Sequence, residues 1–257
     1  MSNIANLLTS AAENGDITAK TANILTNATT LREIKKGDGV SAENFPHSAV
    51  RIITILLDDS TSIHEKGNTQ DLIEGHNQII QALRGASKKQ QLETIVSCRT
   101  LNNGPMYTYK HLADVPKLTT ATFTPGGPTP LFDQSIVTVG SVIAKVQEFE
   151  NAGIAARTWT LIVSDGGDYG SQRKAHDVAT VIAELNSEQH LIMAMGVSDG
   201  STDFNKVFLA MGVKQPNIDV VNGRDSAAVR RKFNQASQSA AGLASTAAPS
   251  SVGGLLD

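Results

Sequence analysis

Residues 51–62, RIITILLDDSTS, decide the fold class of this chain. The first seven of them, 51–57, form a nearly continuous apolar run, which is typical of a strand covered on both faces, as in a parallel sheet. The run ends directly in two carboxylates and three hydroxyls, at residues 58–62. Because functional groups in an open α/β sheet gather at the carboxyl ends of its strands, this ending indicates a candidate site.

The same kind of run recurs along the chain and alternates with helical patterns. Further strand-like runs lie at 93–98, 157–163, 190–196 and 217–221. Amphipathic helical patterns lie at 70–84, 130–150, 173–186 and about 225–238. Residues 105–118 are harder to assign and are compatible with a short strand at the sheet edge. The alternation predicts a Rossmann-like, doubly wound, mostly parallel α/β sheet with helices on both faces.

Two flanking segments lie outside this alternation. Residues 49–238 are expected to form one domain. Residues 1–48 are expected to form an N-terminal helical extension of two short helices and a linker, with Asp16 as the N-cap of the second helix. Residues 239–257 are rich in Ala, Ser and Gly and are expected to form a loose C-terminal tail.

Composition excludes several classes of function. The formal net charge is −3 and aromatic residues make up 4% of the chain, so no nucleic-acid or anionic-lipid surface is expected. The single cysteine, Cys98, excludes an internal disulfide. The N-terminus lacks the features of a secretory signal, and no apolar run reaches the roughly 18 residues that a membrane span needs. We therefore expect a cytoplasmic protein that does not bind membranes.

Two more segments place polar chemistry next to the ends of predicted strands. TPGGPTPLFD, residues 124–133, leads into the helix expected from residue 130, and VSDGGD, residues 163–168, ends the third strand-like run. Each segment alone is explained by turn and cap chemistry, and Thr129 before Pro130 is a typical helix start with threonine as N-cap. Together with residues 58–62 they gather carboxylates and hydroxyls, without His or Cys at zinc spacing. Such hard oxygen donors suit Mg²⁺ or Mn²⁺.

This set of residues resembles the metal-ion-dependent adhesion site (MIDAS) of von Willebrand factor type A (VWA) domains. That site has the pattern Asp-x-Ser-x-Ser, a later Thr and a later Asp, and the matching residues are Asp58, Ser60, Ser62, Thr129 and Asp165. The similarity covers about residues 48–238. The resemblance implies that the two serines and the threonine ligate Mg²⁺ (or Mn²⁺) directly, and that the aspartates do so directly or through water. It also implies an open sixth position for a Glu or Asp side chain of a protein partner.

Two residues depart from the family pattern without removing a ligand. Thr61 stands where many relatives have Gly, and Pro128 interrupts the junction between glycine and threonine. Asp59 is a spare carboxylate that is expected to point away into a supporting bond. The remaining residues of note are expected to be structural, with His64 at the surface and the others packed in the core: His76, Cys98 and Trp159.

The function expected from this resemblance is metal-dependent binding of a protein partner, without catalysis, by an adaptor or a subunit of a larger complex. A serine-hydrolase interpretation of GVSDG, residues 196–200, fails because all six histidines precede Ser198 and that fold needs one after it. An aspartyl phosphatase of the haloacid dehalogenase type fails as well, because no second Asp follows two residues after Asp58 or Asp59. Two alternatives stay open: a structural subunit of a large assembly with a vestigial metal site, and a metal-assisted hydrolase.

Overall fold

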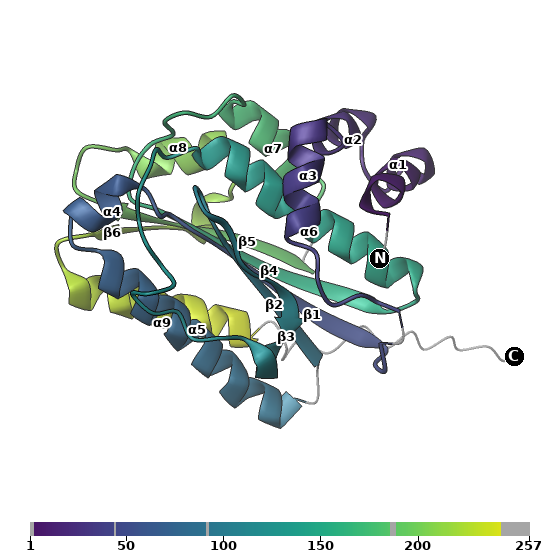
Figure 1. Cartoon of the computed structure of the whole chain (residues 1–257), viewed down its shortest axis with the longest axis horizontal. Helices are drawn as coiled ribbons and strands as arrows, with labels where there is room; N and C mark the ends of the chain where they lie inside the picture. The colour runs from purple at the N-terminus through teal and green to yellow at the C-terminus, as the bar shows by residue number, and fades with distance from the viewer. Residues whose placement is uncertain (1–2, 44, 91–92, 186–188, 243–257) are drawn as a thin grey trace, which may run out of the picture.

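A six-stranded sheet runs through the centre of the computed structural model, which describes residues 3–43, 45–90, 93–185 and 189–242 (Figure 1). In chain order its strands are β1 (Ala49–Leu57), β2 (Glu93–Thr100), β3 (Gly104–His111), β4 (Ala155–Ser164), β5 (His190–Ser198) and β6 (Ile218–Asn222). The spatial order is β3-β2-β1-β4-β5-β6, and every pairing is parallel except that of β3 with β2. The predicted mostly parallel sheet is confirmed, and residues 105–118 contain its antiparallel edge strand.

Helices cover both faces of the sheet (Figure 1). One face carries α4 (Thr61–Glu65), α5 (Thr69–Gln90) and α9 (Ser226–Gly242). The other carries α1 (Ile4–Asn14), α2 (Ala19–Leu25), α3 (Ala28–Lys36), α6 (Leu131–Asn151), α7 (Ala175–Ala183) and α8 (Phe204–Ala210). Two 3-10 turns, Leu112–Asp114 and Gln215–Asn217, complete the connections. None of the described helices combines the length and apolar composition that crossing a lipid bilayer requires.

The apolar run of β1 is continuous because both of its faces are buried. Ile52 and Leu56 belong to the apolar core under α6, whereas Ile53, Ile55 and Leu57 belong to the core under α5 and α9. Successive side chains of a strand point to opposite faces, so one strand contributes to two cores. The central strand β1 is thereby fixed in register, and its polar ending at residue 58 is held at the carboxyl edge of the sheet.

The N-terminal segment contains three helices, and the prediction of two was wrong. The predicted N-cap Asp16 was also wrong: the hydroxyl of Thr18 accepts the N–H of Thr21 and caps α2. These helices share a core with the domain, since Leu8, Leu25 and Ile34 pack in the same cluster as α6. The structure therefore shows the extension folded onto the sheet domain.

Four helices differ from the predictions in their bounds or in their presence. Helix α6 begins at Leu131 with Pro130 as its N-cap residue, so Thr129 is not the cap. Two helices were not predicted, α4 and α8, which have 5 and 7 residues and are too short to show a clear amphipathic period. Helix α9 extends into the expected tail as far as Gly242, and residues 243–257 lie outside the described part of the chain.

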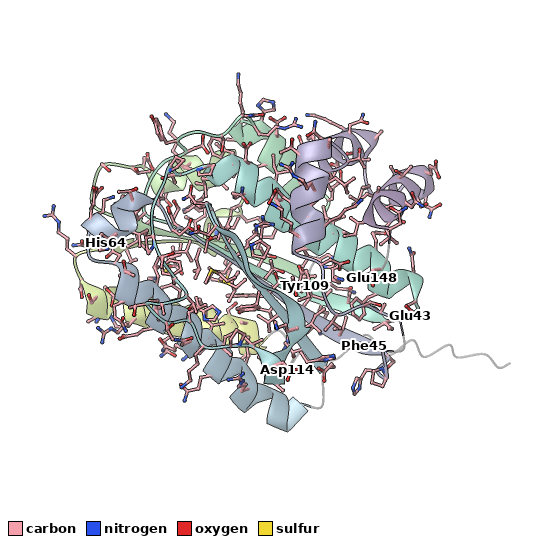
Figure 2. The ribbon with its side chains drawn as sticks, viewed as in Figure 1. Glu43, Phe45, His64, Tyr109, Asp114 and Glu148 are labelled. Carbon is pink, nitrogen blue, oxygen red and sulfur yellow. The ribbon has the colours of Figure 1, made fainter. Side chains whose placement is uncertain are left out.

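The residues expected to be structural lie where they were predicted. Cys98 and Trp159 are fully buried, and the buried imidazole of His76 bonds the Tyr107 hydroxyl through Nε2 at 2.7 Å. Burial lowers the pKa of His76 to about 4, so the ring is neutral near pH 7. His64 is exposed on α4, at the outer surface of the molecule (Figure 2).

Candidate metal centre

The three polar segments of the sequence converge at the carboxyl edge of the sheet. The N–H of Asp58 donates to the carbonyl of Val163 at 3.0 Å, which joins the end of β1 to the end of β4. The N–H of Thr61 donates to the carbonyl of Gly127 at 3.1 Å, which attaches loop 124–130 to the same turn. Segments about seventy and a hundred residues apart in the chain are therefore held together by backbone hydrogen bonds. The convergence predicted from strand-end geometry is present.

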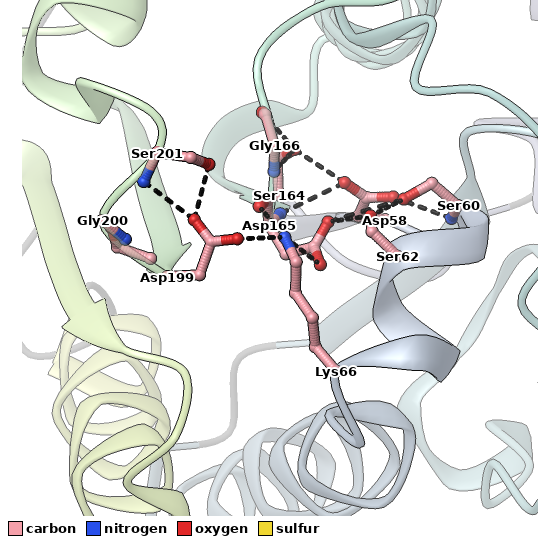
Figure 3. A network of polar contacts seen from close by, with 11 residues as sticks. Asp58, Ser60, Ser62, Lys66, Ser164, Asp165, Gly166, Asp199, Gly200 and Ser201 are labelled. Carbon is pink, nitrogen blue, oxygen red and sulfur yellow. Dashed lines mark hydrogen bonds and ion pairs between the residues drawn. The ribbon is translucent and has the colours of Figure 1, made fainter.

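Three side-chain oxygens form a small triangle at this edge (Figure 3). The Ser60 and Ser62 hydroxyls are 3.0 Å apart, and Asp165 Oδ1 accepts from Ser62 at 2.6 Å and from Ser60 at 3.5 Å. Asp165 is fully buried and Ser60 is 1% exposed. These oxygens come from the turn after β1 and the turn after β4, so the sheet itself sets their spacing.

The carboxylate of Asp58 lies behind this triangle and is fully hydrogen-bonded. Its Oδ1 accepts the N–H of Ser60 at 2.8 Å, and its Oδ2 accepts the hydroxyl of Ser164 at 2.7 Å and the N–H of Asp165 at 3.2 Å. Burial raises the pKa of Asp58, and the nearby charge of Asp165 adds to the rise, while bonds from Ser60 and Ser164 oppose it. Asp58 therefore organises both turns and presents no oxygen free of protein donors.

Thr129 reaches the site through a short β-bridge. Its N–H donates to the carbonyl of Tyr169 at 3.1 Å and its carbonyl accepts the N–H of Tyr169 at 2.8 Å. The Thr129 hydroxyl lies 4.0 Å from the point where a β-carbon on Gly166 would stand, beside Asp165. Thr129 is 8% exposed, so its side chain faces the turn after β4 instead of solvent.

The spare carboxylate beside the motif, Asp59, points away from the triangle, as expected. Its two oxygens accept four hydrogen bonds, from the backbone and side-chain amides of Asn102 (2.8 and 3.0 Å) and of Asn103 (3.2 and 2.8 Å). Both asparagines lie in the turn between β2 and β3. Asp59 therefore ties the edge hairpin to the site, and Asp58 and Asp165 are left as its two inward carboxylates.

Sequence reasoning missed two charged residues at the site, Lys66 and Asp199 (Figure 3). The ammonium of Lys66 lies 3.3 Å from Asp165 Oδ2, 3.1 Å from the Asp165 carbonyl and 3.0 Å from Asp199 Oδ2. Burial lowers the pKa of Lys66, but the hydrogen bonds and charges of Asp199 and Asp165 outweigh it, so the pKa is raised. Bonds from the hydroxyl and N–H of Ser201 and from Lys66 lower the pKa of Asp199. No local sequence pattern signals this contact.

Known structures with a similar fold share little sequence with this chain. Proximal thread matrix protein 1 from the mussel byssus matches with a TM-score of 0.51 at 16% identity, over 76% of this chain and 47% of that one. The pilus adhesin SpaC from Lactobacillus rhamnosus GG matches with a TM-score of 0.51 at 8% identity, over 79% of this chain and 32% of that one. The vWF domain of the type V pili tip protein Mfa5 from Porphyromonas gingivalis matches with a TM-score of 0.48 at 11% identity, over 78% and 96%. No family model and no curated protein matches the sequence.

The strand order with its single antiparallel edge and the structural matches agree with the resemblance found in the sequence. The chain has the VWA fold. It spans less than half the length of the mussel protein and of SpaC. The mussel protein has also been solved with zinc occupying its MIDAS motif. Identities this low establish the fold alone, so the ligands of this VWA site must be argued from its own geometry.

The oxygens at the carboxyl edge of this VWA fold fit a small, hard cation. Adjacent ligands of an Mg²⁺ octahedron lie about 3.0 Å apart when each is about 2.1 Å from the metal. The triangle of Ser60, Ser62 and Asp165 has edges of 3.0, 2.6 and 3.5 Å, centred on that value. Asp165 Oδ2 is buried and has no hydrogen-bond partner among the described residues, so only the ammonium of Lys66 faces it. Within the same residues no three His, Cys, Asp or Glu side chains form a cluster, so hydroxyls must supply part of any ligand set.

Proposed function

We propose that this VWA-fold protein binds a protein partner through a divalent cation, Mg²⁺ or Mn²⁺, at the carboxyl edge of its sheet. The observation that carries the proposal is the oxygen triangle of Ser60, Ser62 and Asp165, whose edges of 3.0, 2.6 and 3.5 Å average to the roughly 3.0 Å edge of an Mg²⁺ octahedron. Thr129 would add a ligand from the neighbouring loop. Asp58 would act through a bridging water, because protein donors already occupy both of its oxygens. The bound ion would supply a Lewis-acidic position for a Glu or Asp of the partner.

The chemistry of the ligands explains why an acidic partner is expected. Ser60, Ser62 and Thr129 are neutral, so only Asp58 and Asp165 offset the charge of a divalent ion. Neutral oxygen ligands leave the ion electron-poor, and one more carboxylate is then attracted strongly. A neutral or basic group of the partner would gain less from the same position.

The proposed role is binding without catalysis, in an intracellular setting. Absence of catalysis is supported by the position of Asp58, whose carboxylate is fully buried and accepts three hydrogen bonds from the protein, so it offers no exposed oxygen to a substrate. A purely structural role carried by residues 1–48 has less support, because the apolar faces of these helices are already buried against α6. Turnover of a phosphoester panel would contradict the absence of catalysis, and fractionation of the native cells tests the intracellular setting.

Calorimetric titration with Mg²⁺ and Mn²⁺ tests the metal site directly. Wild type should bind one ion per chain. Ser62→Ala and Thr129→Val each remove one oxygen ligand and should weaken binding at least about tenfold, if a ligand contributes at least the roughly 1.4 kcal/mol of a hydrogen bond to a charged group. Thr108→Val is the matched control, because Thr108 lies on the outermost strand β3. Equal affinity in all four proteins would overturn the proposed site.

Selection from a random peptide display library tests the partner chemistry. Peptides captured with Mg²⁺ and released by chelator should share one Asp or Glu, and Thr129→Val should capture few of them. For an enriched peptide, replacing that Glu by Gln, or Asp by Asn, should abolish binding while neighbouring substitutions are tolerated. Peptides that bind equally in chelator, or that lack an acidic residue, would contradict the proposal.

A further inference from the structure

Lys66 occupies an unusual position for a positive charge, next to a proposed ligand of a cation. It is the C-cap residue of the short helix α4, and its ammonium lies between the turn after β4 and the turn after β5. Of its two carboxylate partners, Asp165 is fully buried and Asp199 lies in the exposed turn after β5. Lys66 thus links the inside of the site to its rim.

The charges explain why a lysine is tolerated there. Asp58 and Asp165 are both fully buried at the same edge of the sheet, where the backbone N–H of Asp165 donates to Asp58 Oδ2 at 3.2 Å and, after burial, the charge of Asp165 contributes to the raised pKa of Asp58. Asp58 is compensated by hydrogen bonds from Ser60 and Ser164. The Asp165 Oδ2 atom lacks such donors among the described residues and has the ammonium of Lys66 in their place. Without it, a buried carboxylate would lose its counter-charge.

A second carboxylate is already in contact with the same ammonium. Asp199 Oδ2 lies 3.0 Å from Lys66, and Asp199 Oδ1 is held by the N–H and hydroxyl of Ser201 at 2.9 and 2.5 Å. A cavity of about 280 Å³ adjoins both side chains and is also lined by Asn68, Gly223 and Arg224. The Lys66 side chain is 29% exposed, so the ammonium has room to leave Asp165 while it stays on Asp199.

We infer that Lys66 is an internal counter-cation of Asp165 that a divalent ion displaces, and that Asp199 retains the lysine when it moves. This inference rests on the proposed metal site and adds how that site is regulated. Lys66 sets the concentration at which the ion binds, because the ion must compete with a charge that belongs to the protein. Partner binding then follows the local concentration of divalent cation over a range that Lys66 determines.

The size of the effect follows from the charges and their separation. If Lys66 stayed on Asp165 Oδ2, an ion about 2.1 Å from Oδ1 would lie about 6 Å from the ammonium. Even with the dielectric constant of water, that repulsion would weaken ion binding roughly tenfold, and it favours the departure of the lysine. A lower effective dielectric constant makes the factor larger. Removing the positive charge should therefore tighten Mg²⁺ binding at least about tenfold.

Calorimetric titration with Mg²⁺ alone, paired with thermal melting, tests the inference in a set of Lys66 variants. Lys66→Met should bind Mg²⁺ at least about tenfold more tightly than wild type, melt at a lower temperature in chelator and gain more from added Mg²⁺. Lys66→Arg keeps the charge and should resemble wild type. Lys20→Met, on the exposed surface of α2 and across the molecule from α4 (Figure 1), removes the same net charge and should change nothing.

A second substitution tests the role of Asp199. Asp199→Asn leaves the Lys66 ammonium with Asp165 as its one carboxylate partner among the described residues, so the lysine should leave Asp165 less readily. With Lys66 present, Mg²⁺ binding should therefore weaken severalfold. In the Lys66→Met background the same change should have a much smaller effect, and this difference measures the coupling of the two residues.

The outcomes separate this inference from the proposed function. Equal Mg²⁺ affinity in wild type, Lys66→Met and Lys66→Arg would overturn the inference and leave the metal site intact. No Mg²⁺ binding in any variant would overturn the proposed function itself. If Lys66→Met does not fold in chelator, its refolding in Mg²⁺ supports the inference, and the Mg²⁺ affinity is then measured on Lys66→Gln. Failure of both Lys66→Met and Lys66→Gln to fold in Mg²⁺ would contradict the inference.

Discussion

Two glycines of α5 offer a test of how the helix layer packs, because the same substitution should have opposite effects at the two positions. A β-carbon on Gly75 would stand 2.4 Å from ring atoms of Phe233 on α9, which is fully buried. A β-carbon on Gly85 would meet no atom within 4 Å. Gly75→Ala therefore forces two packed helices apart, whereas Gly85→Ala adds a methyl group at an open position.

The magnitudes follow from helix propensity and packing. Alanine is favoured over glycine inside a helix by about 1 kcal/mol, so Gly85→Ala should raise the free energy of unfolding by roughly 0.5–1 kcal/mol and the melting temperature by about 1–4 °C. Overpacking a core costs about 1–3 kcal/mol, and a contact this close to a fully buried ring belongs at the upper end. Gly75→Ala should therefore lower the free energy of unfolding by about 2 kcal/mol after the propensity gain of about 1 kcal/mol.

Urea unfolding followed by circular dichroism measures both changes, and an unchanged m-value ensures that stability alone is compared. The clash predicts a further result: in a Phe233→Leu background, where the ring is absent, Gly75→Ala should be neutral or stabilising. The resulting coupling energy isolates the contact between the two residues. If Gly75→Ala is as stable as Gly85→Ala, or if its cost persists with leucine at position 233, the packing argument is refuted.

Two further predictions concern the other face of the sheet and the buried histidine. Gly140→Ala on α6 would place a β-carbon 2.5 Å from Leu25 and 2.9 Å from Ile34, so it should loosen the N-terminal helices and make them more readily cleaved by trypsin. Overpacking costs about 1–3 kcal/mol, and after the propensity gain of about 1 kcal/mol the free energy of unfolding should fall by up to about 2 kcal/mol; unchanged proteolysis would contradict it. The pKa of His76 is about 4 in the folded state, below the ordinary 6.5, so the unfolded state takes up the proton first as the pH falls. The contribution of the neutral His76 ring to the free energy of unfolding is therefore complete above pH 6.5 and is lost as the pH falls towards 4. In urea titrations, the free energy of unfolding of wild type should fall by about 3 kcal/mol more than that of His76→Gln between pH 7 and 4.

The sequence was informative wherever a local pattern reflects a physical requirement. The strands could be predicted because burial on both faces makes a strand continuously apolar, as in β1. The convergence of the polar segments could be predicted because Asp58, Ser60 and Ser62 follow that strand directly, and strand ends meet at one edge. The contact of Lys66 with Asp165 and Asp199 could not be predicted, since it joins residues 99 and 133 positions away through the order of the strands. Caps were ambiguous for a simpler reason: Asp16 and Thr18 are both good cap residues two positions apart.

The three aspartates of the site differ in their hydrogen-bond partners, and this difference assigns each of them a separate role in the proposed function. Asp59 is saturated by four amide donors and holds the edge hairpin. Asp58 accepts three hydrogen bonds from the two turns and fixes their separation, and the serine hydroxyls stand 3.0 Å apart, the spacing that the proposed Mg²⁺ would require. Asp165 accepts the two serine hydroxyls on Oδ1, whereas its Oδ2 has no N–H or O–H donor among the described residues and faces the ammonium of Lys66. In the proposed function, a cation at Asp165 would replace the charge of Lys66 and the hydroxyl contacts of Asp165 Oδ1, while the hydrogen bonds of Asp58 and Asp59 would continue to hold the loops together.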